Sequence, residues 1–450
     1  MKRFQRGAVL SIVMAMLAFS PATARDILIE NVTLIDGLGR APTEGISVLI
    51  ADDRIDSITA GLVEVPSDVH RIDGSGKYLI PGLIDTHIHL RGGRKPSKGD
   101  PRKWRNGRKA GVSALASYVY SGVTSIYDAG NVPTYIMKLR ADERSGKISS
   151  PRIFATGGIV TYPGSHGGGP GATLVDDWPE AIPALEAHLE NEPDLVKFTL
   201  EERGWGARPL IPMLPIDLLQ HLIEFYNDKG VRTTVHTSSE LRARQAIFAG
   251  VDTLAHPVIQ GPISEGFAKL MGVKKIPMSS TLTIGENYSR LAEHPEYLDQ
   301  PLYRAALAAE EIEELKNKTS KEFNQRSWTW WMKIMTPIAQ ENLRQIYAAG
   351  GVLALGTDQS SGPAVHREME LLVDAGIAPL DVITIATRNG AIFLGIENTL
   401  GTIEAGKLAD MVLLNADPSA DINNAKLIHT VIKNGEIIDR SKLPLAGAIE

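Results

Sequence analysis

The chain has 450 residues, of which 43% are hydrophobic and 22% are charged, and its formal net charge is −6. This composition is that of an ordinary globular protein, and the negative charge excludes a generally basic nucleic-acid-binding protein. The sequence contains no cysteine, which excludes disulfides, thiolate metal ligands and a cysteine nucleophile.

Residues 1–24 have the features of a secretory signal peptide. Lys2, Arg3 and Arg6 precede the apolar run GAVLSIVMAMLAF, and the small residues ATA before Arg25 fit a cleavage site. The apolar run is shorter than the roughly 20 residues that a membrane span needs, so an uncleaved anchor is the less favoured alternative. We therefore expect a secreted or periplasmic protein that has no membrane attachment after cleavage.

Short alternating β segments occupy both ends of the remaining chain. DILIENVTLIDG and GISVLIADDRIDSI lie near the N-terminus, and LADMVLLNADP and HTVIKNGEIID lie near the C-terminus. Alternation of apolar and polar residues is typical of half-buried strands. We predict that residues 25–80 and 400–450 together form a small β-sandwich domain.

The long middle, residues 81–399, repeats a pattern of a short apolar run followed by an amphipathic stretch. The runs are YLIPGLIDTHIHL, GVTSIYDAG, PRIFATGG, PDLVKFTL, GVRTTVHTS, GVDTLAHP, KKIPMSSTLTI and GGVLALGTD. Eight strands that alternate with helices predict an α/β fold of the (β/α)8 TIM-barrel type. A doubly wound open sheet is the alternative.

Two segments interrupt this pattern. Residues 91–109 carry nine Arg or Lys side chains against one Asp, and residues 284–342 form a mostly helical insertion that contains Trp328, Trp330 and Trp331. The basic segment follows the first barrel strand, where it would attract an acidic substrate, although a solvated surface is the simpler interpretation. The tryptophans fit a substrate pocket, a subunit interface or plain core packing.

Polar residues lie at or near the ends of five strand-like runs. They are His87 and His89 in the first run, Lys197 in the fourth, His236 in the fifth, His256 in the sixth and Asp358 in the eighth. Active sites of such barrels lie at the C-terminal strand ends, and imidazole and carboxylate groups are ligands for zinc and similar ions. A single histidine would be read as structural, but this set predicts a metal site.

Lys197 stands out because it occupies the middle of a strand with strongly apolar neighbours, DLVKFTL. Lysine is almost never fully buried unless something pairs with it. An ammonium group has no acceptor and cannot bind a cation, whereas burial near cations favours the neutral amine. A side chain that extends its charged end to water is the alternative.

PGLIDTHIH, GTD and ATRNGAIFLGIENTLGTIEAGKLADMVLL resemble motifs of the amidohydrolase superfamily, and the resemblance covers nearly the whole mature chain. The D-x-x-K pattern of Asp194 and Lys197, with His236 and His256 only twenty positions apart, is most similar to the Xaa-Pro dipeptidase-like and carboxypeptidase-like members. Phosphotriesterase-like members usually lack the sandwich, and single-metal deaminase members lack the lysine of the fourth strand.

The resemblance implies a centre with two divalent metal ions, for which zinc is the expected metal. His87, His89 and Asp358 would hold the more buried ion, and His236 and His256 the more exposed one. Lys197, carbamylated by CO2, would bridge both ions. Asp358 would also be the catalytic acid–base, exchanging a proton with a metal-bridging hydroxide and the leaving amine.

His166, in the glycine-rich segment GGIVTYPGSHGGGPG, resembles a substrate-binding position of the dipeptidase-like members, and a loop histidine without a functional role is the alternative.

The expected function is hydrolysis of dipeptides, N-acyl amino acids or aryl amides. The alternatives are a phosphotriester, lactone or carbamate hydrolase with the same centre, a single-metal hydrolase of a cyclic amidine or imidazolone, and a scaffold without activity. The expected partner is a small amide or peptide, not a nucleic acid, and a homo-oligomer stays open.

Overall fold

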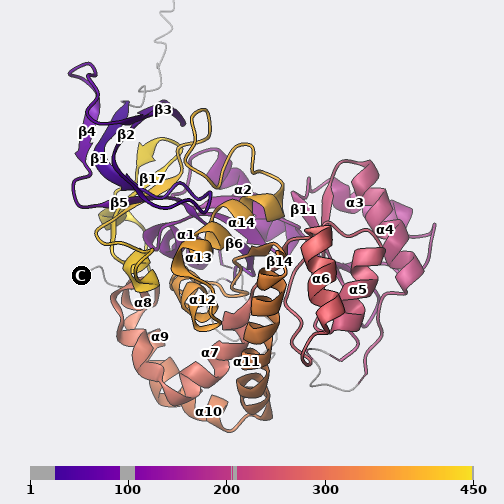
Figure 1. The fold of residues 1–450 in the computed structure, drawn as a ribbon. Coiled ribbons are helices and arrows are strands. Elements are labelled where there is room, and N and C mark those ends of the chain that lie inside the picture. The colour runs from indigo at the N-terminus through magenta and orange to yellow at the C-terminus, as the bar shows by residue number, and fades with distance from the viewer. Residues whose placement is uncertain (1–25, 92–106, 204, 206–209, 448–450) are drawn as a thin grey trace, which may run out of the picture.

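The computed structural model describes residues 26–91, 107–203, 205 and 210–447 of the chain (Figure 1). The predicted signal peptide, 1–24, lies outside the described residues. So does most of the basic segment 91–109, of which the ends are described. Within the described ranges, no helix combines the length and the apolar character needed to cross a lipid bilayer.

One sheet contains strands from both ends of the chain. Its strands are β1 (Ile27–Leu34), β2 (Thr43–Ala51), β3 (Arg54–Ala60), β4 (His70–Asp73), β5 (Tyr78–Pro81), β16 (Met411–Leu414), β17 (Ile428–Lys433) and β18 (Glu436–Ile437). The order is β18-β17-β16-β5-β1-β2-β3, with β4 paired to β1. β5 and β16 pair antiparallel, so this pairing joins the two ends of the chain. The sheet has an apolar core of its own, which includes Val48, Leu79 and Met411.

Each of the eight strand-like runs of the middle segment contains a strand. These strands are β6 (Leu83–Ile88), β7 (Val123–Asp128), β8 (Arg152–Ala155), β11 (Leu195–Thr199), β12 (Arg232–His236), β13 (Thr253–Leu254), β14 (Met278–Ser279) and β15 (Leu353–Ala354). Neighbouring strands pair in parallel within two sheets, β6-β7-β8 and β11 to β15. Two short strands, β9 (Val160–Thr161) and β10 (Thr173–Leu174), extend the second sheet beyond β11.

Backbone hydrogen bonds connect these two sheets at both of their junctions. Thr86 N–H donates to the Leu355 carbonyl at 2.8 Å, and Asp358 N–H donates to the His87 carbonyl at 2.7 Å, which joins the segment after β15 to β6. At the other junction, Asp194 N–H donates to the Ala155 carbonyl at 3.0 Å. The C-terminal ends of the first and last strands are thereby held side by side.

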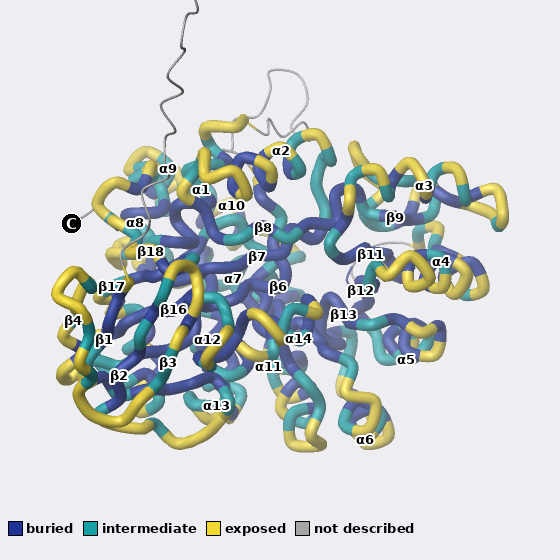
Figure 2. The backbone as a smooth tube through the Cα atoms, turned by 90° about the horizontal axis from the view of Figure 1, so that it is seen from above, coloured by how far each residue is buried: buried dark blue, intermediate teal, exposed yellow. Residues whose placement is uncertain are grey.

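Helices follow the barrel strands and cover them from outside (Figures 1 and 2). They are α1 (Arg108–Tyr120), α2 (Pro133–Arg144), α3 (Ile182–Leu189), α4 (Ile216–Asp228), α5 (Glu240–Phe248), α6 (Glu265–Lys274), α12 (Pro363–Asp374), α13 (Pro379–Ala386) and α14 (Arg388–Leu394). Local chemistry sets some of the starts: the side chains of Ser239 and Ser264 accept from the backbone N–H groups of Arg242 and Phe267 at the first turns of α5 and α6.

The insertion forms a helical lobe at the lower side of the view in Figure 1. It consists of α7 (Leu282–Glu293), η1 (Pro295–Asp299), α8 (Pro301–Ala306), α9 (Ala309–Glu314), η2 (Leu315–Thr319), α10 (Ser320–Asn324) and α11 (Ser327–Ala348). A separate apolar core that includes Leu291, Leu298 and Phe323 holds the lobe together.

The tryptophans of the insertion do not form one cluster. Trp330 is 66% exposed, whereas the Nε1–H of Trp331 donates to the Trp205 carbonyl at 3.1 Å. Trp328 packs edge-to-face on Tyr288, with 6.2 Å between the ring centroids. The three side chains point to different surroundings because they follow one another on a helix, where successive residues face different directions.

A buried ion pair connects the β domain to the barrel and yields a first prediction. Lys433 of β17 donates from Nζ to Glu143 Oε1 of α2 at 2.8 Å, and the two side chains are 9% and 5% exposed. Lys433→Met leaves a buried carboxylate without its partner and should lower the free energy of unfolding by about 3–5 kcal/mol. Urea denaturation followed by circular dichroism measures this loss.

The double variant Lys433→Met/Glu143→Leu removes both charges and should recover most of the stability. Lys269→Met is the matched control, because Lys269 pairs with Glu265 at the surface, where the side chains are 70% and 82% exposed, and its loss should cost less than about 1 kcal/mol. A double variant as unstable as the single variant would contradict the assignment.

Candidate metal centre

The barrel strands bring all the predicted ligand positions to one place. His87 lies in β6 and His89 directly after it, Lys197 lies in β11, and His236 is the last residue of β12. The remaining two follow β13 and β15: they are His256 and Asp358. Because parallel strands end at the same side of a barrel, residues from distant parts of the sequence meet here.

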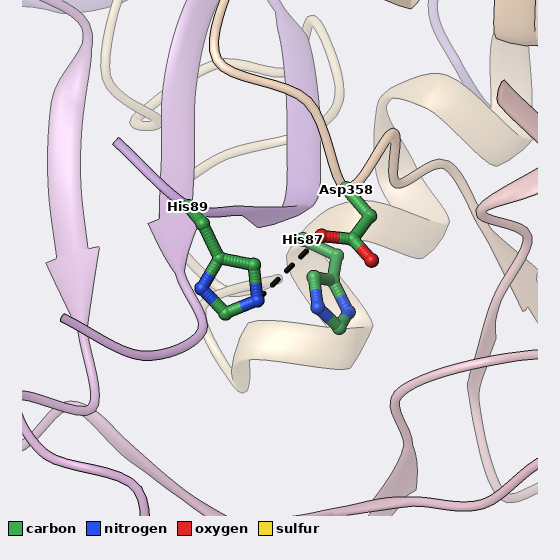
Figure 3. Close-up of side chains that lie close together, drawn as sticks. All are labelled: His87, His89 and Asp358. Carbon is green, nitrogen blue, oxygen red and sulfur yellow. Dashed lines mark ion pairs between the residues drawn. The ribbon is translucent and has the colours of Figure 1, made fainter. Parts of the chain in front are cut away.

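His87, His89 and Asp358 form the tightest group (Figure 3). Each of them offers one ligand atom, and these atoms all lie within 4.8 Å of one another. His89 Nε2 and Asp358 Oδ1 are 3.5 Å apart, which is the contact drawn as a dashed line in Figure 3. Two imidazoles and a carboxylate at this separation are a donor set that suits a divalent cation.

Hydrogen bonds fix the orientation of the imidazoles. The Nδ1 atom of His87 lies 2.9 Å from the Ala255 carbonyl, and the Nδ1 atom of His89 lies 2.7 Å from the Gly130 carbonyl. A carbonyl only accepts, so Nδ1 carries the proton in both rings and Nε2 keeps its lone pair. This is the arrangement in which backbone groups orient metal-binding histidines.

Lys197 lies against the same group. Its side chain is buried, and its Nζ atom is 3.0 Å from His87 Nε2. Burial lowers the pKa of Lys197 to about 8, while the nearby carboxylates Asp358 and Asp128 act in the opposite direction. The amine is therefore much closer to its neutral, nucleophilic form than an exposed lysine would be.

His236 and His256 lie beside the group of three rather than within it. The ring of His256 is 4.4 Å from that of His87 and 4.5 Å from that of His236, measured between centroids. The Nδ1 atom of His256 lies 3.0 Å from Thr281 Oγ1. The Nε2 atom of His236 is buried and has no hydrogen-bond partner among the described residues. A buried polar atom of this kind costs free energy unless something else satisfies it.

The predicted substrate residue lies in the same cluster. The ring of His166, from the loop between β9 and β10, stacks on that of His236 with 4.3 Å between centroids and 15° between planes. Trp205 contacts His236 and His256 edge-on, at 5.2 and 4.6 Å. Through its bond to Trp331, Trp205 connects the inserted lobe to these two histidines.

The surroundings disfavour positive charge on the histidines. Burial is the main cause that holds the pKa values of His87, His89, His236 and His256 well below their usual range. Burial also raises the pKa of Asp358 to about 6, against the opposing charge of Lys197. Neutral imidazoles are the form that binds metal ions. The lowered pKa values of the histidines therefore fit a metal-binding role for them.

Two buried carboxylates that the sequence analysis did not single out hold the loops of this centre. Asp85 accepts from Thr357 N–H at 3.0 Å, from Thr357 Oγ1–H at 2.7 Å and from His87 N–H at 3.1 Å. Asp128 accepts from Leu90 N–H at 2.9 Å. The sequence signal for both is an acidic residue inside or at the end of an apolar strand, as in LIDTHI and VTSIYD.

Glu201 is a third carboxylate that the sequence analysis missed. It is 1% exposed, its Oε2 atom lies 3.9 Å from His236 Nε2, and the hydroxyl of Ser238 donates to it. Burial raises the pKa of Glu201 to about 7. Asp194, in contrast, is structural: it accepts from Arg140 at 2.6 Å and from Ala155 N–H at 2.9 Å, and so fixes the start of β11.

Comparison with known proteins agrees with this architecture. Residues 78–438 match the model of the amidohydrolase family. Imidazolonepropionase of Phocaeicola vulgatus is 23% identical over 403 residues, which cover 83% of this chain and 84% of that protein.

Among solved structures, a Xaa-Pro dipeptidase with bound methionine superposes with a TM-score of 0.74 and 23% identity, over 92% of this chain and 99% of the other. Phenylurea hydrolase B gives a TM-score of 0.75 and 22% identity, over 94% and 99%. These likenesses confirm the predicted fold, an α/β barrel with an added β domain.

Close packing beside His87 yields a second prediction. A Cβ atom at Gly356 would lie 2.1 Å from Ser279 Oγ and 2.9 Å from His87 Cβ. Gly356→Ala should therefore displace His87, lower the free energy of unfolding by about 1–3 kcal/mol and weaken metal retention. Metal analysis after dialysis, together with urea denaturation, measures both effects.

Gly266→Ala in α6 is the matched control, because the nearest atom to its added Cβ lies 3.6 Å away. That variant should keep wild-type stability and metal content. Equal metal retention in both variants would contradict the importance of the close contact at His87.

Proposed function

The chain belongs to the amidohydrolase family, with a match over residues 78–438, and is a hydrolase that acts on C–N bonds. We propose that it cleaves the amide bonds of dipeptides, N-acyl amino acids or aryl amides with the help of two divalent metal ions, and the imidazole and carboxylate donors suit zinc. The observation that carries the proposal is the buried amine of Lys197 within 3.0 Å of His87 Nε2, inside a cluster of imidazoles and a carboxylate.

The donor set fits a pair of cations. His87, His89 and Asp358 would hold the first, and His236 and His256 the second. The support is that His87 and His89 keep Nε2 lone pairs in the site, and that His236 Nε2 is a buried atom without a partner among the described residues. Such cations, when bound, supply Lewis acidity and lower the pKa of water to near neutrality.

Lys197 would join the two positions as a carbamate. Its neutral Nζ forms a bond to the carbon of CO2, a C–O π pair moves to oxygen, and one N–H proton passes to solvent. The product has two acceptor oxygens that share one negative charge, where the ammonium had only donors. The pKa of about 8 that burial gives the amine supports this reaction, since a substantial fraction of the amine is then neutral near physiological pH.

Asp358 would move the proton during catalysis. Its carboxylate is within 3.5 Å of His89 Nε2, and burial raises its pKa to about 6. A group with a pKa near the working pH can both accept and return a proton. In this role Asp358 takes a proton from the attacking water and delivers it to the leaving amine. His166, stacked on His236, would contact the substrate or its oxyanion.

The imidazolonepropionases among the relatives favour a second candidate, a single-metal hydrolase of a cyclic amidine or imidazolone. That function gives no role to a buried lysine beside the first two histidines, which is why we place it second. Hydrolysis of phosphotriesters, lactones or carbamates needs the same donor set and stays a further candidate.

The signal-like residues 1–24 support action in the periplasm or outside the cell.

A substrate panel tests the proposal. The metal-loaded mature protein is assayed with dipeptides, N-acyl amino acids and aryl amides beside imidazolone propionate, phosphotriesters and lactones. We expect amide hydrolysis with two metal ions per chain. Activity on the imidazolone alone, with one ion per chain and an unmodified Lys197, would overturn it in favour of the second candidate.

The role of Asp358 gives a third prediction. Asp358→Asn keeps the size of the side chain but removes its basicity, so kcat should fall roughly a hundredfold to ten-thousandfold while the circular dichroism spectrum is unchanged. Asp228→Asn, at the exposed C-terminal end of α4, is the control and should leave kcat as it is. Wild-type turnover by Asp358→Asn would remove that residue from the mechanism.

The role of Lys197 gives a fourth prediction. After incubation with zinc and ¹³C-labelled bicarbonate, the wild type should show a carbamate carbon signal by NMR and bind two metal ions per chain. Lys197→Met should lack the signal and bind fewer ions, and Lys269→Met, a surface variant, should behave as the wild type. Two ions per chain in Lys197→Met, or no carbamate signal in the wild type, would contradict the bridging role.

A further inference from the structure

A cavity between Asp358 and the inserted lobe lies beside the candidate metal centre. Its volume is about 1310 Å³, and Asp358 is part of its wall. Pockets for drug-sized ligands occupy about 300–1,000 Å³, so this space exceeds what a dipeptide fills. The wall includes residues of α1, of the insertion from α7 to α10, of the segment 358–361, of the start of α12, and residues 444–446 near the C-terminus.

The far wall of this cavity is aromatic. Tyr288, Tyr297, Tyr303 and Phe323 line it, with the apolar side chains Leu291, Leu298, Leu307 and Leu315 beside them. All eight belong to the insertion, residues 282–348, and none comes from a barrel strand. An apolar wall with aromatic rings suits a ligand with an aromatic or extended hydrocarbon part.

Three of the arginines on the cavity wall, Arg108, Arg290 and Arg367, differ in whether a carboxylate pairs with them. Arg367 pairs with Glu286 at 3.0 Å and Glu370 at 2.7 Å, and Arg108 pairs with Asp142 at 2.8 Å. Arg290 of α7 has no carboxylate within ion-pair distance in the part of the chain that the structure describes. Its guanidinium lies 3.9 Å from the centroid of the Tyr297 ring, and Nη1–H donates to Tyr303 Oη at 3.3 Å.

These contacts hold Arg290 in place without neutralising it. A ring face attracts a cation and fixes the plane of the guanidinium, and the bond to Tyr303 uses one of its five donors. The remaining donors suit the fork of a carboxylate, which guanidinium binds with two parallel hydrogen bonds. A half-buried arginine on the cavity wall, with no carboxylate within ion-pair distance among the described residues, is in place to bind an anionic ligand.

The helix sets the distance between this arginine and the reacting atoms. Thr283, in the first turn of α7, donates from Oγ1 to the Thr357 carbonyl at 2.8 Å, directly beside Asp358. Arg290 lies seven residues farther along α7, which is roughly 10 Å at 1.5 Å per residue. Its anionic partner is therefore remote from the scissile bond, unlike the carboxylate of a dipeptide.

We propose that this cavity is the substrate chamber and that Arg290 is its carboxylate-binding residue. The enzyme then selects amides that carry an aromatic or extended hydrocarbon part and a carboxylate several bonds away from the scissile bond. The proposal rests on the proposed amide hydrolysis and adds to it the part of the substrate that is recognised. It assigns specificity to the insertion, while the chemistry stays with the barrel.

A series of ω-carboxyacyl p-nitroanilides tests this assignment, with chains from succinyl to suberoyl and the methyl ester of each as the uncharged partner. For the wild type we expect kcat/KM to rise with chain length for the acids and each acid to exceed its ester. Arg290→Met should raise KM for the long acids at least tenfold, with kcat and the values for the esters unchanged. Arg290→Lys should fall between the two.

Arg326→Met is the matched control, because Arg326 is also stacked on a ring of the lobe, Phe323, at 4.7 Å, but is exposed and is not part of the cavity wall. It should leave all values as in the wild type. If Arg290→Met affects acids and esters equally, or neither, the carboxylate-binding role is wrong, while hydrolysis by the wild type still supports the proposed function.

Direct binding separates the two proposals further. Isothermal titration of the protein as purified with 6-phenylhexanoate should give measurable binding for the wild type and for Arg326→Met, and at least tenfold weaker binding for Arg290→Met. This result would support the chamber even if none of the anilides is hydrolysed. Equal binding by the wild type and Arg290→Met would overturn it whatever the activity.

Discussion

The centre of this molecule is governed by the cost of placing an amine, four imidazoles and a carboxylate together away from water. Lys197 and His87 are both buried, and their nitrogen atoms are 3.0 Å apart. Positive charge on either disfavours positive charge on the other, and burial lowers the pKa of both. The cluster therefore combines neutral imidazoles with an amine that loses its proton more readily than an exposed lysine and with a nearby carboxylate, which is a set of groups that suits a bound cation.

This arrangement needs a rigid frame, and buried carboxylates provide part of it. Asp85 joins the first barrel strand to the segment that carries Asp358 through two hydrogen bonds from Thr357, and burial raises the pKa of Asp85 to about 8. Gly356 allows His87 to pack against that same segment with no side chain between them. The relative positions of His87 and Asp358 thus depend on how the first and eighth strands are joined.

The sequence was sufficient to predict the strands and the cluster because both depend on local patterns. An apolar run predicts a strand. A polar residue at or after its C-terminal end is then expected to lie at the barrel mouth, as His236 and Asp358 do. The partners of Asp85 were not predictable, since its contact with Thr357 joins residues 272 positions apart. Glu201 was missed for the same reason: only the fold shows that it lies beside His236.

The insertion illustrates why the cluster at the strand ends is easier to predict from the sequence than the substrate. The aromatic composition of the insertion left its role open. In the structure, Trp330 faces solvent, Trp328 packs on Tyr288, and Trp331 is hydrogen-bonded to Trp205. Helix α7 starts where the seventh strand ends and is bonded to the segment of Asp358 through Thr283. A ligand that reaches from Asp358 to the aromatic wall of the lobe therefore lies along α7, whose first turn is bonded to the segment that carries Asp358. Changes in the lobe can alter which molecules fit while the strand ends, and hence the chemistry, stay the same.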